Sequence, residues 1–256
     1  MNVLKDLLEI WKTRESLYLF PTTDIISTPH DLGIPYRDVN IKAGPLRING
    51  WFMESPGSVK LMIFSHGNAG NISHRLQFIE FWNRHLSDHY SLFMYDYPTF
   101  GKSTCEGLLL PSVTLCKRAL KAVVTLFENH FTSITLYGES IGGAITAVVA
   151  TEMRSASVDK IVLQSTFTSL GDMASQLNGV IGFLAGFVTE QLDVMDACRE
   201  IRKRGIDLVI MHSPDDELVP FSMFKRMKTY ATSTLELKGG HNTTVFDESV
   251  ADILLR

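Results

Sequence analysis

The chain has 256 residues, of which 45% are hydrophobic and 20% charged, and its formal net charge is −4 at pH 7. This length and composition suit one large globular domain with a single core. Lys and Arg are scattered rather than gathered, which argues against a nucleic-acid partner, and no apolar run is long enough for a membrane-spanning helix.

Cysteine usage and the first residues bear on the compartment. The three cysteines, Cys105, Cys116 and Cys198, are odd in number and have no C-x-x-C spacing. We therefore expect no disulfide framework, and we expect a reducing, cytoplasmic location. Charged residues also interrupt the N-terminal stretch where a signal peptide needs an apolar core, which disfavours secretion by that route.

Residues 1–19 are predicted to form an amphipathic helix. Five apolar side chains fall on one face of it: Val3, Leu4, Leu7, Leu8 and Trp11. Two interpretations stay open at this point. The helix docks on the domain, or it lies in a membrane interface and gives the protein a peripheral membrane contact.

Strand-like and helix-like segments alternate through the rest of the chain. Strands are predicted at 36–43, 46–54, 60–64, 91–95, 133–137, 159–164, 207–211 and 234–237. Helices are predicted from about residue 73, after Pro111, and at 143–150, 221–230 and 245–255. This order predicts the α/β class, with a mostly parallel central sheet and helices on both faces.

We expect a single domain over residues 20–256, because no linker, repeat or low-complexity tract interrupts it. The segment at about 171–205 is long for a crossover and is interpreted as a small insert or lid. Its stretch from Val180 to Val188 is apolar all round. That stretch lines or covers an acyl pocket, or it is a plain buried helix.

The motif Gly138-Glu139-Ser140-Ile141-Gly142 stands between a predicted strand and a predicted helix. G-x-S-x-G in that setting is typical of a nucleophile elbow, a turn so sharp that the Ser Oγ is exposed and its neighbours must be Gly. An ordinary Gly-rich turn with a capping Ser is the alternative. The flanking elements favour Ser140 as a nucleophile.

A serine nucleophile needs a base and a carboxylate, in the chain order Ser, Asp or Glu, His. His241 is the one His downstream of the acidic loop that follows the strand at 207–211, so we predict it as the base. Within that loop Asp216 is the favoured acid and Asp215 the next candidate. Loops after late strands meet at one rim of a parallel sheet, which would bring these groups to Ser140.

Two backbone N–H groups are expected to stabilise the developing oxyanion. Ile141, after the nucleophile, should supply one, and Asn68, in the loop after the strand at 60–64, the other. A merely structural turn is the alternative for that loop. His66 lies upstream of Ser140 and is interpreted as a hydrogen-bonder in the turn rather than as the base.

Metal and cofactor signatures are not found in the sequence. There is no H-E-x-x-H motif or other tight cluster of His and carboxylates, and the Gly-rich loops match neither the phosphate-loop nor the dinucleotide fingerprint. We therefore expect no metal and no cofactor.

Taken together, these residues resemble the α/β-hydrolase superfamily, in particular its serine hydrolases with a His-Gly-Asn-Ala-Gly-Asn oxyanion loop. The likeness runs from about Phe20 to His241 and includes the segments 36–39, 50–52, 66–71, 96–103, 138–142, 166–170, 216–220 and 240–242. Bacterial α/β hydrolases and eukaryotic α/β-hydrolase-domain-containing proteins carry similar motifs, and some of the latter remove palmitoyl groups from protein cysteines.

This resemblance implies the α/β-hydrolase fold, with Ser140, Asp216 and His241 as the triad and Asn68 and Ile141 as the oxyanion donors. The chain departs from the family pattern after Asp96, where Tyr97-Pro98-Thr99 replaces an aromatic or Arg followed by Gly. That loop borders the site in relatives, so the departure implies an altered substrate fit.

The predicted function is that of a serine hydrolase that cleaves carboxylic esters or thioesters through an acyl-enzyme. Its substrate would be a small molecule, an acylated protein or a lipid-like ester. Activity should fall at low pH as His241 becomes protonated. A serine peptidase is the alternative among enzymes, and a non-catalytic hydrolase-fold binding protein is the alternative from another class.

Overall fold

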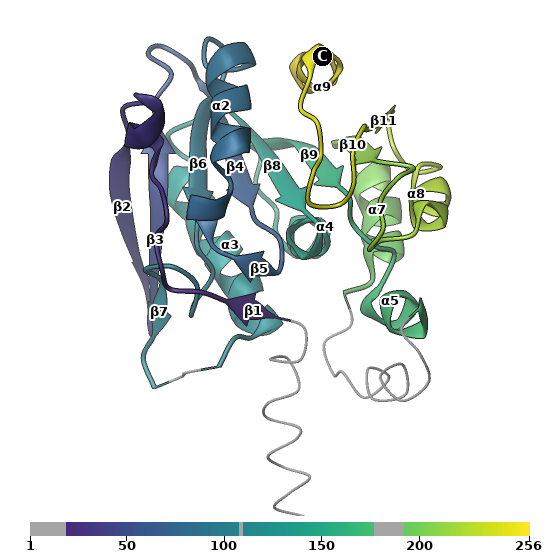
Figure 1. The fold of residues 1–256 in the computed structure, drawn as a ribbon, viewed down its shortest axis with the longest axis horizontal. Coiled ribbons are helices and arrows are strands. Elements are labelled where there is room, and N and C mark those ends of the chain that lie inside the picture. Colours follow the sequence, from purple (N-terminus) through teal and green to yellow (C-terminus); the bar gives the residue numbers. More distant parts are fainter. Residues whose placement is uncertain (1–18, 108–109, 177–191) are drawn as a thin grey trace, which may run out of the picture.

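The computed structural model describes residues 19–107, 110–176 and 192–256 (Figure 1). Within these ranges nine strands form one sheet, in the order β11-β10-β9-β8-β4-β6-β3-β2, with the short β7 paired to β3. Neighbouring strands from β11 to β6 are parallel, whereas β3 is antiparallel to β6, β2 and β7. The strands are β2 (Arg37–Ala43), β3 (Leu46–Met53), β4 (Lys60–Ser65), β6 (Ser91–Tyr95), β7 (Thr104–Cys105), β8 (Ser133–Glu139), β9 (Val158–Gln164), β10 (Asp207–His212) and β11 (Ser233–Glu236).

Helices cover both faces of this sheet, as the sequence predicts. The described α-helices are α2 (Leu76–His85), α3 (Val113–Phe127), α4 (Ile141–Glu152), α5 (Leu170–Gln176), α7 (Val194–Lys203), α8 (Phe221–Met227) and α9 (Glu248–Leu255). One apolar cluster joins the sheet to α3, α4, α7 and α8, and a second joins it to α2 and α9. The α/β class with a mostly parallel central sheet is therefore confirmed.

The central strand β4 shows how the sequence builds the two layers. Successive side chains of a strand point to opposite faces of its sheet. Leu61 and Ile63 pack in the cluster of α3 and α4, whereas Met62 and Phe64 pack in the cluster of α2 and α9. All four side chains are buried, so the middle of the strand is apolar on both faces, as is typical of a parallel strand covered on both sides.

A second, two-stranded sheet joins the start of the described chain to the loop after β4. The strands β1 (Phe20–Pro21) and β5 (Ala69–Gly70) pair in parallel, with Phe20 opposite Ala69. The Phe20 N–H also donates to the Asn68 carbonyl at 3.0 Å. This tie places the lead-in of the domain beside the loop in which the sequence predicts an oxyanion donor (Figure 1).

Two helix starts differ from the prediction. A 3-10 turn, η3 (Ile72–His74), precedes α2, so the helix predicted from about residue 73 begins at Leu76. The final helix begins at Glu248 rather than 245, because the Asp247 side chain caps it by accepting the Ser249 N–H at 3.1 Å. A further 3-10 turn, η2, covers Pro29–Leu32.

The predicted insert at 171–205 contains a helix of the main fold. α7 is part of the crossover from β9 to β10, and its buried residues Val194, Ala197, Cys198 and Ile201 join the core beside α4. The apolar stretch 180–188 and the predicted N-terminal helix up to residue 18 lie outside the described residues. Among the helices that the structure describes, none is both long and apolar enough to cross a bilayer.

Candidate active site

Ser140 lies at the junction of β8 and α4, in a strained backbone conformation. Its φ of 55° and ψ of −120° are rarely adopted by a residue with a Cβ. Hydrogen bonds hold both of its backbone groups. The Ser140 N–H donates to the Gln164 carbonyl at 2.8 Å, and the Thr166 hydroxyl donates to the Ser140 carbonyl at 2.7 Å. The side chain of Ser140 is thereby turned out at the carboxyl end of β8.

The glycines around Ser140 are required by the packing of this turn. A Cβ on Gly138 would overlap the backbone of Gly142 and Gly143 at the start of α4. A Cβ on Gly142 would overlap the carbonyl groups of Ser65 and His66 at the end of β4. The elbow is therefore pressed directly against the loop that follows β4, which brings the two predicted parts of an oxyanion site together.

Three side chains from distant parts of the chain form one continuous series of hydrogen bonds. His241 Nε2 lies 3.1 Å from Ser140 Oγ, and His241 Nδ1 lies 2.8 Å from Asp216 Oδ2. The loop after β10 carries Asp216, and the loop after β11 carries His241. Glu217 also accepts the His241 backbone N–H at 2.9 Å, which links these two loops directly.

The electrostatic setting of Asp216 suits an orienting carboxylate. Its side chain is fully buried, and burial alone would raise its pKa. Hydrogen bonds from His241 and from the backbone N–H groups of Val219 and Leu218 outweigh burial and hold the pKa of Asp216 below its usual value. An ionised Asp216 accepts a hydrogen bond from the N–H at His241 Nδ1, which leaves Nε2 unprotonated and able to accept the Ser140 hydroxyl proton.

Asp215, the other acid that the sequence leaves open, has a different position. Its residue is exposed, and its backbone N–H donates to the Ser213 hydroxyl at 3.1 Å. Among the described contacts, the carboxylate that meets the His241 ring is that of Asp216. The geometry therefore favours Asp216 over Asp215.

His212 also belongs to this site, although no pattern in the sequence indicates it. It is the last residue of β10 and is completely buried. Its Nε2 lies 2.9 Å from the Val219 carbonyl and 3.3 Å from Asp216 Oδ2, so this nitrogen carries a proton that it donates. Burial lowers the pKa of His212 by more than the Val219 carbonyl and Asp216 raise it, so the ring is neutral.

The two predicted oxyanion donors lie on either side of the elbow contact described above. Ile141 is the first residue of α4, and the first N–H groups of a helix have no acceptor within that helix. Asn68 lies in the loop after β4, where its carbonyl accepts the Phe20 N–H. The geometry brings the two segments together, and the donor roles of both residues stay predictions.

His66 is completely buried, and the ring that meets the Ser140 hydroxyl is that of His241. Its Nδ1 lies 2.7 Å from the Gly67 carbonyl, and its Nε2 lies 3.7 Å from Asp96 Oδ1. Burial, reinforced by the nearby charge of Arg75, lowers the pKa of His66 to about 3. A ring that stays neutral and donates to its own turn fits the prediction of a hydrogen-bonding role rather than that of the base.

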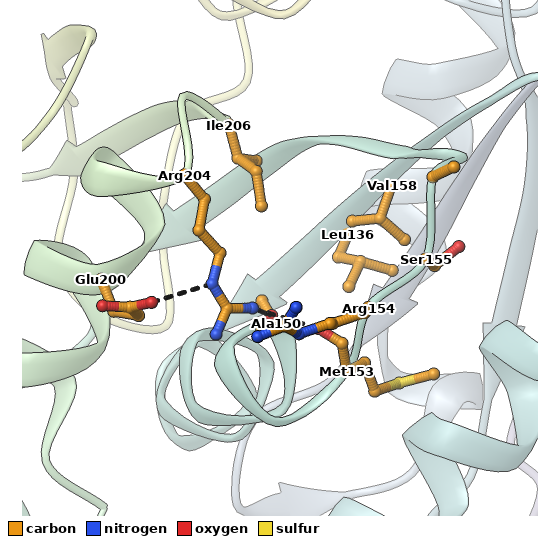
Figure 2. A pocket seen from close by; sticks show the side chains of 10 residues that line it. Leu136, Ala150, Met153, Arg154, Ser155, Val158, Glu200, Arg204 and Ile206 are labelled. Carbon is orange, nitrogen blue, oxygen red and sulfur yellow. Dashed lines mark hydrogen bonds and ion pairs between the residues drawn. The ribbon is translucent and has the colours of Figure 1, made fainter.

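A cavity of about 540 Å³ lies at the other end of α4 (Figure 2). Ala150, Met153, Val158, Glu200 and Arg204 are among the residues that line it. α4 begins directly after the elbow and has 12 residues, which is a length of about 18 Å at 1.5 Å per residue. None of the predicted triad or oxyanion residues lines this cavity.

Within the described ranges, no group of three or more His, Cys, Asp or Glu side chains is arranged to hold a metal ion. The arrangement can support acyl transfer: it places a serine hydroxyl at a sharp turn, a ring nitrogen within hydrogen-bond reach of it, and a buried carboxylate behind that ring.

Comparison with known proteins identifies the family of the chain. Residues 60–191, more than half of the chain, match the model of the alpha/beta hydrolase fold family. Protein bem46 of Schizosaccharomyces pombe is 29% identical over 207 residues, which cover 76% of this chain and 65% of bem46. This chain thus spans slightly less than two thirds of that relative. The uncharacterized membrane protein YNL320W of Saccharomyces cerevisiae is 26% identical over 242 residues, 90% of this chain and 81% of the yeast protein.

Solved structures share the fold at low sequence identity. The Pyrococcus furiosus esterase Pf2001 superimposes with a TM-score of 0.70 at 21% identity, over 93% of this chain and 95% of the esterase. The thioesterase domain from the curacin biosynthetic pathway superimposes with a TM-score of 0.61 at 13% identity, over 87% of this chain and all of that domain.

Proposed function

This chain belongs to the α/β hydrolase fold family, and from that premise we propose that it is a serine hydrolase that cleaves carboxylic ester or thioester bonds through an acyl-enzyme. The observation that carries the proposal is the hydrogen-bond series from Ser140 Oγ through His241 to the buried Asp216, at 3.1 and 2.8 Å.

The first half of the reaction forms the acyl-enzyme. As Ser140 Oγ attacks the carbonyl carbon, His241 Nε2 takes the hydroxyl proton, and Asp216 stabilises the imidazolium that results. The negative charge moves to the carbonyl oxygen, to which the N–H groups of Asn68 and Ile141 would donate hydrogen bonds. Collapse of the tetrahedral intermediate breaks the bond to the alcohol or thiol, which leaves with the proton from His241.

The second half releases the acid. A water molecule gives one proton to His241 Nε2 as its oxygen attacks the acyl carbon. When the second tetrahedral intermediate collapses, the bond to Ser140 Oγ breaks and His241 returns the proton to it. The products are a carboxylic acid and the enzyme in its starting form.

The names of the similar structures support the ester and thioester class. One is an esterase and another a thioesterase domain. We extend the proposal to acylated proteins and lipid-like esters as substrates alongside small molecules. One relative is named a membrane protein, so we keep the peripheral membrane contact as a proposal together with the cytoplasmic location.

The test is hydrolysis by the full chain of p-nitrophenyl esters and acyl thioesters graded by acyl length. Ser140→Ala should lower kcat at least about 1000-fold, because the remaining groups cannot form the acyl-enzyme. A fluorophosphonate probe should label the parent at Ser140 and should not label the variant. Ser140→Ala hydrolysing the esters as fast as the parent would refute the proposal.

Ser165→Ala is the matched control. Ser165 follows β9 as Ser140 follows β8, it also has a positive φ of 48°, and its buried hydroxyl has no hydrogen-bond partner among the described residues. This variant should retain the activity and labelling of the parent. Cleavage of peptide amides without cleavage of thioesters would favour a peptidase, and a parent that the probe leaves unlabelled would favour a non-catalytic binding protein.

A further inference from the structure

An ion pair that the proposed reaction does not use lies beside the nucleophile. Arg75 Nε is 3.2 Å from Glu139 Oε2, and a second guanidinium nitrogen of Arg75 is 3.3 Å from Glu139 Oε1. The two planar groups therefore meet as a fork, a geometry that fixes direction as well as distance. Glu139 immediately precedes Ser140, and Arg75 follows the loop and the 3-10 turn after β4.

The loop after β4 lies directly against this pair. A third nitrogen of Arg75, Nη1, donates to the Ala69 carbonyl at 2.8 Å. A Cβ on Gly67 would come within 3.0 Å of Glu139 Oε1 and 3.1 Å of Arg75 Nη2, and a Cβ on Gly70 would come within 3.1 Å of Arg75 Nη1. The ion pair thus contacts the loop on both sides of Asn68, at Gly67 and Gly70. A side chain at either position would push the loop away from the ion pair.

The Arg75–Glu139 pair is much more buried than the surface ion pairs of the described residues. The side chains of Arg75 and Glu139 are 15% and 18% exposed, whereas those of Arg37 and Glu54 are 68% and 63% exposed. Exposed pairs contribute little, because water screens them and their side chains must be ordered. A mostly buried fork holds its geometry more firmly, and losing one partner leaves the other charge without compensation.

We propose that Arg75 and Glu139 are positioning residues that hold the oxyanion loop at a fixed distance from the nucleophile elbow. The pair acts through the backbone: Glu139 moves with Ser140 and Ile141, and Arg75 moves with the loop that carries Asn68. The two N–H groups proposed to bind the oxyanion therefore keep one spacing. This inference rests on the proposed hydrolase function, and it adds two residues that touch neither substrate nor proton.

The test compares Arg75→Gln, Glu139→Gln and the double variant with the parent on one p-nitrophenyl ester. Each single variant should lose kcat by about 10- to 100-fold, less than the loss expected for deleting an oxyanion donor, while KM stays within about threefold of the parent. The double variant removes both charges, so it leaves no uncompensated buried ion. It should be no slower than the slower single variant, because the two residues form one unit.

Affinity for an alkyl trifluoromethyl ketone supplies a readout that a purely structural role would not move. This inhibitor forms a tetrahedral adduct with the serine, and its oxyanion needs the same two donors as the reaction. Its affinity should fall by the same factor as kcat/KM in each variant. Arg75→Lys keeps the charge and loses the fork, so it should fall between the parent and Arg75→Gln.

Glu152→Gln is the matched control, because Glu152 is at the far end of α4 and pairs with Lys117 and Lys121. It should leave kcat and inhibitor affinity unchanged, with the folded fraction of every variant checked by circular dichroism. A loss confined to KM would overturn the inference and make Arg75 a substrate-binding group. An active parent with unaffected Arg75 and Glu139 variants would overturn this inference alone, and a parent that cleaves no ester or thioester would overturn the proposed function as well.

Discussion

His212 shows how one buried side chain can act on the proposed reaction from behind its acid. Its Nε2 proton is within reach of both Asp216 Oδ2 and the Val219 carbonyl, at 3.3 and 2.9 Å. Asp216 Oδ2 therefore faces two imidazoles, one from His212 and one from His241. The N–H of His212 is donated to the Val219 carbonyl, and its positive end also faces the carboxylate, which stabilises the charge of Asp216 and helps to fix the direction from which His241 is held.

We predict that His212→Leu lowers kcat/KM by about 10-fold, which corresponds to about 1.4 kcal/mol of lost electrostatic support for Asp216. Without the N–H of His212 beside it, the charge of Asp216 acts more strongly on His241 and stabilises its protonated form. The acid limb of the pH–rate profile should therefore move to higher pH. Steady-state kinetics across that limb provide the measurement.

His212→Gln is the companion variant, since its amide can still donate a hydrogen bond in the same direction. It should lie closer to the parent than His212→Leu does, both in rate and in the position of the acid limb. If His212→Leu and His212→Gln lose activity equally and the acid limb of the pH–rate profile does not move, His212 contributes only to packing at the end of β10.

At the scale of single elements, α4 is fixed at both of its ends by different means. At its start, the packing of Gly142 on the end of β4 sets its position. At its end, Arg204 donates to the carbonyls of Ala150, Thr151 and Met153, and its Nε donates to Glu200 (Figure 2). Those carbonyls are the acceptors that a helix leaves without an internal partner, and a cation is favourable at that end.

Arg204→Met is expected to lower the free energy of unfolding by about 1–3 kcal/mol, because several charge-assisted hydrogen bonds are lost while the apolar stem is kept. Its kcat should stay near that of the parent, since Ser140 is at the opposite end of α4. Urea denaturation gives the stability and ester hydrolysis gives the rate. Arg202→Met, at an exposed position near the end of α7, should change neither, and an equal loss in both variants would contradict the capping role.

The elements also show what the sequence could predict and what it could not. The strand at 91–95 has the predicted bounds, and the strands predicted at 36–43 and 46–54 are present as β2 and β3, because buried or alternating side chains extend over several residues. β1 and β5 escaped prediction because two residues are too few to show a pattern. The ends of α2 and α9 depend on a 3-10 turn and a cap, which act locally and leave the periodicity unchanged.

The candidate site follows the same division. Motif and chain order led to Ser140, Asp216 and His241, whose side chains do meet. His212 was missed because a lone His at the end of an apolar strand has no spacing that sets it apart. The contact of Arg75 with Glu139 joins residues 64 positions apart, and no local pattern can indicate such a pairing.

For the molecule as a whole, two buried titratable groups make opposite contributions to stability. Burial raises the pKa of Asp96 from 3.8 to about 7, despite the Ile72 N–H that its carboxylate accepts. Burial lowers the pKa of His66 from 6.5 to about 3. The folded state therefore binds the Asp96 proton more tightly than the unfolded state does, and the His66 proton less tightly. The contribution of Asp96 to stability therefore falls as the pH rises from about 4 to 7. The contribution of His66 to stability increases as the pH rises from about 3 to 6.5.

Asp96→Asn should separate these two contributions, because an amide resembles the protonated acid and cannot ionise. We predict that the free energy of unfolding of the variant, relative to the parent, increases as pH rises from about 4 to 7, by up to about 1.4 kcal/mol per pH unit. Urea denaturation at several pH values in that window measures it. Asp88→Asn, at an exposed aspartate, is the control. A relative stability of Asp96→Asn that does not change with pH would contradict the prediction.

The pairing of β1 with β5 allows the opening of the loop after β4 to be measured by hydrogen exchange. The Phe20 N–H donates a hydrogen bond to the Asn68 carbonyl, so the Phe20 amide proton exchanges with solvent only when that hydrogen bond opens. Deuterium uptake at this one amide, 48 positions upstream of Asn68, therefore reports how often β1 and the loop after β4 separate. Hydrogen exchange at Phe20 thus measures the opening of this contact without a substitution in the loop itself.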